Sequence, residues 1–159
     1  MSTLAEIRAA ILTVKQSVPN IGKVHDYERY ASKMSDFRKL FYDTDTKLIN
    51  GWWFDRLRTD ELDGDTGEVR RIHTWQFYGF RGLQDGIGSA KSFQDLIENS
   101  CDAFRTDPTL GGVIDDNKNM DQSFGPVGMQ VDAIETVMFA DVLCHRARLT
   151  LLTETTEPK

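Results

Sequence analysis

The clearest hydrophobic pattern lies near the carboxyl end of the sequence, over residues 142–154. Ala147, Leu149 and Leu151 alternate there with polar residues, and the run contains no glycine or proline. Alternation with a period of two predicts a β-strand that buries one face. Such a strand needs neighbours along its edges and apolar cover on its buried face. The pattern therefore predicts a sheet to which earlier segments contribute.

Two segments in the middle of the chain also have strand character, at residues 47–58 and 68–80. Both are rich in aromatic and β-branched residues, which favour strands. The polar, acidic stretch at residues 59–67 between them predicts an antiparallel hairpin with a long tip. Residues 127–134 are expected to pair with the last strand as a second hairpin.

Helices are predicted where apolar residues recur every three or four positions, at residues 3–16, 27–41 and 89–105. Thr3 begins a sequence with the form of a capping box, which stabilises the first turn of a helix. Ser89 is the expected N-cap of the third helix.

These elements predict an α+β protein with a largely antiparallel four-stranded sheet, made of two hairpins and covered by amphipathic helices. A chain of 159 residues is expected to fold as a single domain over residues 1–159. Residues 111–125 have almost no periodicity and are expected to form a long flexible loop. Residues 155–159 are expected to be a frayed tail.

The composition is that of a globular protein, with 40% hydrophobic and 28% charged residues. The net charge of −6 argues against a general nucleic-acid binder, which usually carries a basic stripe. Cys101 and Cys144 make no disulfide framework, so a reducing compartment is expected. Neither a signal peptide nor a membrane span is expected, because charged residues interrupt every apolar run.

Two stretches come near to known ligand motifs without completing them. The sequence GIGSAKS at residues 86–92 resembles a phosphate-binding loop, but Asp85 and Ala90 stand where that loop needs glycines. Residues 63–68 resemble the start of a calcium loop, whose closing glutamate is replaced by Thr74. We therefore expect a strand-to-helix loop and a solvated hairpin tip, and no cofactor.

The histidines are scattered, and Cys144 and His145 would point to opposite faces of a strand. No spacing of these residues supports a metal site. A small enzyme using Cys and His remains an alternative, and it would require one thiol to be far more reactive than the other. We expect buried structural cysteines and no enzymatic activity.

Four aromatic residues are candidate protein contacts: Trp52, Trp53, Trp75 and Tyr78. Consecutive residues in a strand face opposite sides, so only one ring of the pair Trp52 and Trp53 can be in the core. Such rings could stack on bases, but single-strand binders normally have a basic groove. The acidic composition favours core packing on one face and a protein contact on the other.

Several strings along the chain resemble small tailed-phage proteins of the tail-terminator or tail-completion (neck) class. They are KVHDYERY at residues 23–30, INGW at 49–52, the run at 71–82, the predicted helix at 92–104 and MFADVLCH at 138–145. Together they span most of the chain in element order and length.

The resemblance implies a structural protein of the virion. In that family an α+β protomer assembles into a ring, typically a hexamer, which caps the tail tube and stops its polymerisation. The ring offers a surface to head-completion proteins, and DNA passes through its centre without specific binding. The resemblance implies no catalytic residue, no cofactor and no membrane. It implies a location in the tail or neck of the virion, after assembly in the host cytoplasm.

Acidic residues of the two predicted loops are candidates to line the lumen of such a ring and repel DNA, namely Asp63, Asp65, Asp115, Asp116 and Asp121. Simple solvation is the other interpretation of these carboxylates. The alternative function is an acidic, non-catalytic protein-interaction domain, an adaptor or inhibitor. It would be a monomer with one exposed aromatic patch.

Overall fold

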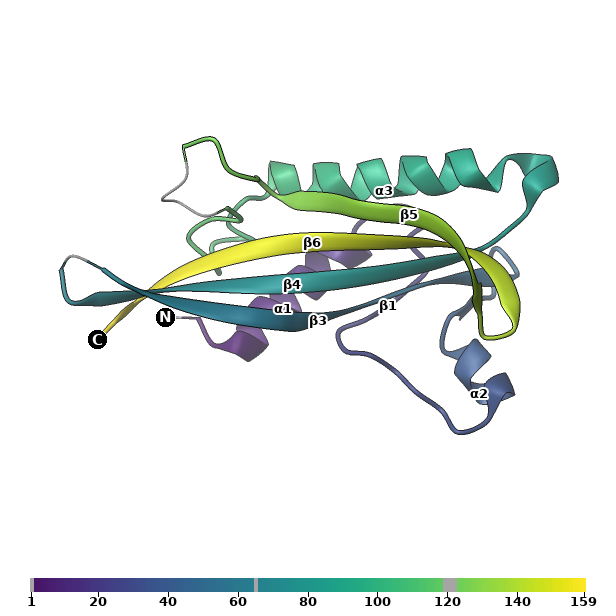
Figure 1. The fold of residues 1–159 in the computed structure, drawn as a ribbon, viewed down its shortest axis with the longest axis horizontal. Coiled ribbons are helices and arrows are strands. Elements are labelled where there is room, and N and C mark those ends of the chain that lie inside the picture. The colour runs from purple at the N-terminus through teal and green to yellow at the C-terminus, as the bar shows by residue number, and fades with distance from the viewer. Residues whose placement is uncertain (1, 65, 119–122) are drawn as a thin grey trace.

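The computed structural model describes residues 2–64, 66–118 and 123–159. In chain order its elements are α1 (Leu4–Gln16), β1 (Lys23–His25), α2 (Met34–Lys39), β2 (Tyr42–Asp43), β3 (Leu48–Asp63), β4 (Glu68–Gly82), the 3-10 helix η1 (Asp85–Ile87), α3 (Ser89–Thr106), β5 (Met129–Phe139) and β6 (Val142–Pro158). The strands form one sheet in the order β1-β3-β4-β6-β5, and β2 pairs with β3. Helices α1 and α3 lie on the same face of the sheet (Figure 1).

The prediction of an α+β protein with a largely antiparallel sheet is confirmed, but the four-stranded, two-hairpin arrangement is wrong. The sheet has six strands and is mixed, because β1 runs parallel to β3. Strands β1 and β2 have only three and two residues. Segments this short carry no periodicity, and only pairing with β3 makes them strands.

The long strands continue further than the hydrophobic pattern indicated. β3 extends to Asp63 and β4 begins at Glu68, so the expected long tip is mostly strand. Polar residues at this end pair across the strands, as in the ion pair of 2.7 Å between Glu61 and Arg71. Opposite charges across strands stabilise a sheet without any apolar alternation.

The connection between β5 and β6 is shorter than the one expected at residues 135–141. Ala140 and Asp141 join them, with φ of 50° and 61°. Two residues of positive φ form the hairpin turn that matches the twist of its strands.

The first and third helices are confirmed within one residue at their ends, whereas the second is largely wrong. The capping box of α1 is present, with Thr3 Oγ1 accepting from the Glu6 amide at 3.2 Å. Of the predicted helix at residues 27–41 only α2 forms. Ser89 is not the N-cap of α3, because Gly88 occupies that position.

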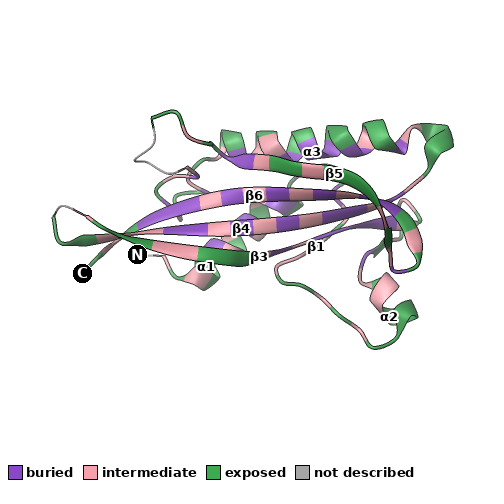
Figure 2. Cartoon of the chain, viewed as in Figure 1, coloured by how far each residue is buried: buried purple, intermediate pink, exposed green. Residues whose placement is uncertain are grey.

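The main core lies between the sheet and the two long helices, and buried positions alternate along β4 and β6 (Figure 2). Completely buried aromatic residues of the sheet contact α1 and α3 there, namely Trp52, Phe54, Trp75 and Phe77. A smaller cluster around Phe41 and Phe80 lies on the opposite face of the sheet and includes Phe37 of α2. The long helices α1 and α3 cover the first face, whereas the short helix α2 packs on the second.

The expected flexible loop and frayed tail are both tied to the sheet where the structure describes them. The Asp115 amide donates to the Glu154 carbonyl at 2.9 Å, and the Glu154 amide donates to the Asp116 carbonyl at 2.9 Å. Asn117 is buried and donates to the Phe104 carbonyl. β6 continues through Pro158, so these backbone groups are paired rather than frayed.

Candidate protein-contact surface

The four candidate aromatic residues divide between the two faces of the sheet. Trp52 and Trp75 are completely buried, and the Trp75 indole donates to the Thr153 hydroxyl at 2.9 Å. They belong to the core and cannot touch a partner. Trp53 and Tyr78 are half-buried and stand directly opposite each other on β3 and β4. Their rings stack with centroids 4.5 Å apart.

Trp53 and Tyr78 line a depression that we call the aromatic hollow. Its volume is about 350 Å³, and its lining is Glu28, Arg29, Phe37, Phe41, Trp53, Tyr78, Phe80, Phe139 and Arg146. Six of these nine side chains are aromatic. A surface depression with this lining is typical of a site that receives an apolar side chain.

Three separate parts of the chain build the hollow. Phe139 at the end of β5 stacks on Phe80 of β4, with ring centroids 3.7 Å apart. Phe37 of α2 contacts Phe139 at 5.4 Å between centroids. Arg38 of α2 donates from Nε to the Ala140 carbonyl at 3.0 Å, which fixes α2 against the β5–β6 turn. The hollow is therefore a product of tertiary packing.

Charged and amphipathic side chains surround the aromatic lining. Arg146 Nε donates to the Glu135 carboxylate of β5 at 3.0 Å, so this guanidinium is neutralised by a neighbour. A hydrogen bond with Glu28 raises the pKa of the Tyr30 hydroxyl. Exposed Tyr27 and Tyr30 come from the segment that leads into α2, and exposed Met34 is the first residue of that helix. An apolar centre with a polar surround is the usual anatomy of a protein interface.

The acidic candidates lie away from the hollow. Asp63 is exposed at the end of β3 and forms an ion pair with Lys159. Asp115 is exposed and Asp116 is half-buried, beside Glu154 of β6. Both places lie toward the β3–β4 turn, at the end of the sheet opposite to α2 (Figure 1). Asp65 and Asp121 lie outside the described residues.

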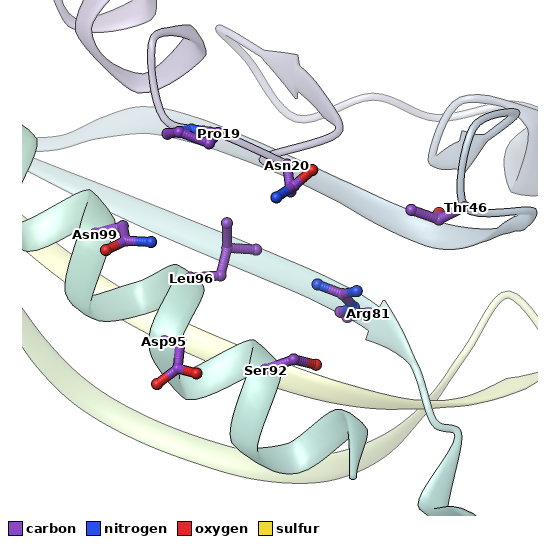
Figure 3. A pocket seen from close by; sticks show the side chains of 8 residues that line it. All are labelled: Pro19, Asn20, Thr46, Arg81, Ser92, Asp95, Leu96 and Asn99. Atoms are coloured by element: carbon purple, nitrogen blue, oxygen red, sulfur yellow. The ribbon is translucent and has the colours of Figure 1, made fainter. Parts of the chain in front are cut away.

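A second cavity, of about 400 Å³, lies between α3 and the sheet (Figure 3). Arg81 extends into it from β4, and its Nε is buried with no hydrogen-bond partner among the described atoms. Asp95 of α3 lines the same space. One basic and one acidic side chain give this cavity no net preference for an anion or a cation.

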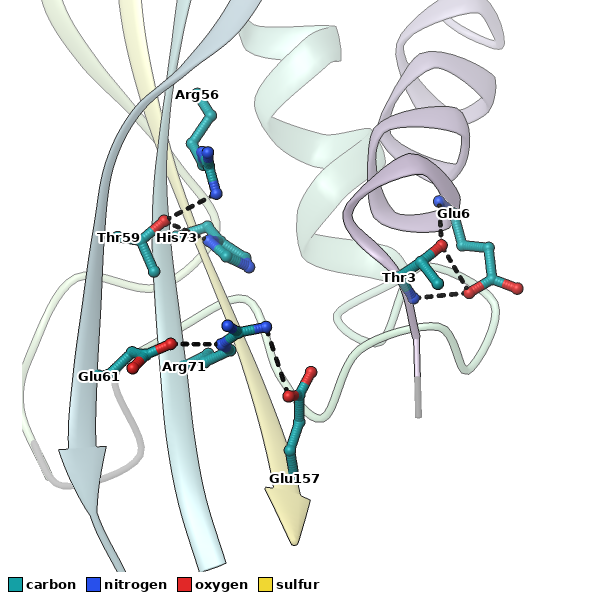
Figure 4. Close-up of polar contacts among 8 residues, drawn as sticks. All are labelled: Thr3, Glu6, Arg56, Thr59, Glu61, Arg71, His73 and Glu157. Carbon is teal, nitrogen blue, oxygen red and sulfur yellow. Dashed lines mark hydrogen bonds and ion pairs between the residues drawn. The ribbon is translucent and has the colours of Figure 1, made fainter. Parts of the chain in front are cut away.

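A polar cluster joins β3, β4 and β6 near the start of α1 (Figure 4). Arg71 pairs with Glu61 and with Glu157, and the Thr59 hydroxyl lies 2.8 Å from His73 Nδ1. Burial lowers the pKa of His73, with the nearby arginines adding to the effect. These groups pair with one another, which is the arrangement of a structural network.

The Cys144 thiol is buried and Cys101 is half-buried, and the buried His145 ring lies 2.8 Å from the Ser89 hydroxyl. Burial raises the pKa of the Cys144 thiol to about 11 and also raises the pKa of Cys101. A thiol with a raised pKa is a poor nucleophile at neutral pH. Among the residues described, no group of three His, Cys, Asp or Glu side chains is placed to hold a metal ion. No helix in the described part is long and apolar enough to cross a membrane.

The chain matches no protein-family model and no curated protein sequence. Its function is therefore inferred from its own surfaces. The aromatic hollow combines a depression, an apolar lining and partial exposure. Of its aromatic residues, sequence reasoning named only Trp53 and Tyr78 as contacts. Phe37 and Phe41 stood out only as part of the predicted second helix.

Proposed function

We propose that this protein is a tail terminator of a tailed phage, a structural protein of the virion that forms a ring, caps the tail tube and joins the tail to the head or neck. The aromatic hollow carries the proposal, because it offers a protein-contact site on a sheet face that the long helices leave free. The tail-terminator-like strings along the sequence point to the same role.

A ring requires two different surfaces on each protomer, so that one copy contacts the next head to tail. The hollow supplies one surface. Exposed apolar residues on and before β5 supply a second, namely Phe124, Val127, Val131, Ile134 and Met138. β5 is also an outer strand, and no described strand pairs with its free edge. A free edge of this kind readily accepts another chain.

The purified protein is expected to form a closed ring, most simply a hexamer, alone or on the ends of tail tubes. Light scattering over a range of protein concentrations measures the mass, and negative-stain imaging shows closure and capping. Mixing with tail-tube protein tests whether the ring stops tube growth. A monomer that neither binds nor caps tubes would contradict the proposal.

That contrary outcome would favour the alternative, an acidic and non-catalytic protein-interaction domain. The hollow also fits this function, because a monomeric adaptor or inhibitor needs one exposed aromatic patch. The two functions differ in assembly. A ring-forming protein reaches the mass of a closed ring, alone or on tail tubes, whereas the interaction domain keeps the mass of one chain and leaves the tubes uncapped.

We further propose that the acidic residues near the β3–β4 turn face the lumen and repel DNA. Reversing the charge of Asp63 and Asp115 to lysine is then expected to make the assembled ring bind DNA at least about tenfold more tightly at low salt, because each new cation can neutralise a phosphate. A gel-shift titration measures this binding. Asp95→Lys on α3 is the matched control, since Asp95 is an exposed acid of another surface. Unchanged DNA binding and delivery would exclude the lumen position.

A further inference from the structure

Phe124 is an outlier among the apolar residues of this protein. Its exposed fraction is 104% of the reference value, so the ring has essentially no protein contacts. Neighbouring Val127 is also exposed. Val131, at the start of β5, is exposed as well, and several exposed apolar residues close together along the chain are typical of a protein-contact surface, in which an aromatic residue is a common anchor.

Phe124 is too far from the hollow of its own chain to fill it. The hollow includes Phe139, at the end of β5, whereas Phe124 precedes Met129, at the start of β5. Phe139 is ten positions after Met129 in β5, which at ~3.3 Å per residue is about 30 Å. Phe124 and the hollow therefore lie toward opposite ends of the strand, and only another molecule can bring them together.

The hollow has the size and lining to receive a phenyl ring. Its volume of ≈ 350 Å³ exceeds that of an apolar cavity of roughly 150 Å³, which is enough to hold benzene. Its exposed walls are the half-buried rings of Phe37, Trp53, Tyr78 and Phe139. Aromatic rings pack against one another edge to face or offset, and such pairs are more favourable than their buried area alone.

The charge around the hollow favours a second copy of this chain as the partner. Residues 23–39, which contribute to its lining, contain five Lys or Arg against three Asp or Glu. The chain as a whole has a net charge of −6. A second acidic copy is therefore attracted to this basic segment more than to the rest of the surface.

We propose that Phe124 of one protomer inserts into the aromatic hollow of a second copy of this chain, an inference that rests on the proposed ring assembly. The inserting residue and the receiving hollow are different surfaces at opposite ends of β5, so the contact can repeat head to tail from one copy to the next. Such a contact repeats from copy to copy and closes into a ring when the rotation between copies allows it.

The first test replaces Phe124 with serine. The variant is expected to associate about 10- to 100-fold more weakly, because one buried phenyl ring is lost from the contact. It is expected to unfold at the same temperature as the parent monomer. Ile87→Ser is the matched control, because Ile87 is 73% exposed on η1 and lies outside the proposed contact. Sedimentation at several concentrations measures association. Equal association of the Phe124→Ser variant and the parent would overturn the inference.

The second test places a photo-crosslinking phenylalanine at position 124 in the full chain. Mass spectrometry of mixed light and heavy isotopic copies is expected to find links between two copies, at Phe37, Trp53, Tyr78 or Phe139. Links to other residues, or only to tail-tube protein, would overturn the inference. If the parent forms a ring but these links are missing, the inference fails and the proposed function stands. If the parent neither assembles nor caps tubes, the proposed function fails, and the inference that rests on it fails as well.

Discussion

Lys15→Met is expected to raise the free energy of unfolding by about 2–4 kcal/mol at pH 7, because it replaces a buried amine by an apolar side chain of similar length. Lys15 is completely buried between α1 and α3. Its Nζ bonds to the Ser100 hydroxyl at 3.0 Å and lies 3.6 Å from the centroid of the Trp52 ring. No carboxylate is among these contacts, so the charged form is poorly compensated.

The same residue gives the stability a distinctive pH dependence. Burial lowers the pKa of Lys15 from 10.5 to about 7. Between these values the unfolded chain binds more protons than the folded one, so the free energy of unfolding rises with pH from about 7 towards 10.5 and is lowest below pH 7. Because one pKa unit corresponds to about 1.4 kcal/mol, the upper bound of this rise is about 5 kcal/mol.

Urea denaturation at pH 6, 7.5 and 8.5 is the measurement, made on the parent and on Lys15→Met. The parent is expected to gain stability over this range while the variant changes much less. Cys101 lies near Lys15 and its raised pKa acts in the opposite direction at higher pH, so the series stops at 8.5. Parallel pH profiles for the two proteins would show that Lys15 is not held as a buried amine.

Gly79→Ala is expected to destabilise the protein by about 3 kcal/mol or more, because the added methyl group has no space. A Cβ at Gly79 would lie 2.4 Å from Trp52 Cζ3 and 2.5 Å from Cε3. Trp52 is completely buried, with Phe93 and Lys15 packed against its ring. The ring therefore cannot move aside without disturbing the core between the sheet and α3.

Thermal unfolding measures this effect, with an expected decrease in Tm of about 6–12 °C for a chain of this size. Gly86→Ala is the matched control, because a Cβ at Gly86 meets nothing within 4 Å. The control is expected to change stability by no more than about 0.5 kcal/mol. Equal Tm values for the two variants would mean that Trp52 does not pack against β4 as described.

The aromatic hollow depends both on the local pattern of the sequence and on the packing of distant segments. Alternation along β3 was enough to place Trp52 and Trp53 on opposite faces. It could not say which face would be free, because that depends on where α1 and α3 lie. Phe37 and Phe139 are far apart in the sequence and meet only when α2 packs against the β5–β6 turn. No spacing within one segment carries that information.

The long elements could be predicted from the sequence, because their signals are local. Strand β6 follows from apolar alternation, β4 from its aromatic and β-branched residues, α1 from its capping box, and α3 from its apolar spacing. Tertiary structure decided the elements whose stability comes from neighbours. β1 exists because its backbone pairs with β3, and the last residues of β6 remain ordered because β4 extends beside them. Most of the expected second helix does not form. Phe37 lies in α2 and Phe41 beyond its end, and both pack in the hollow.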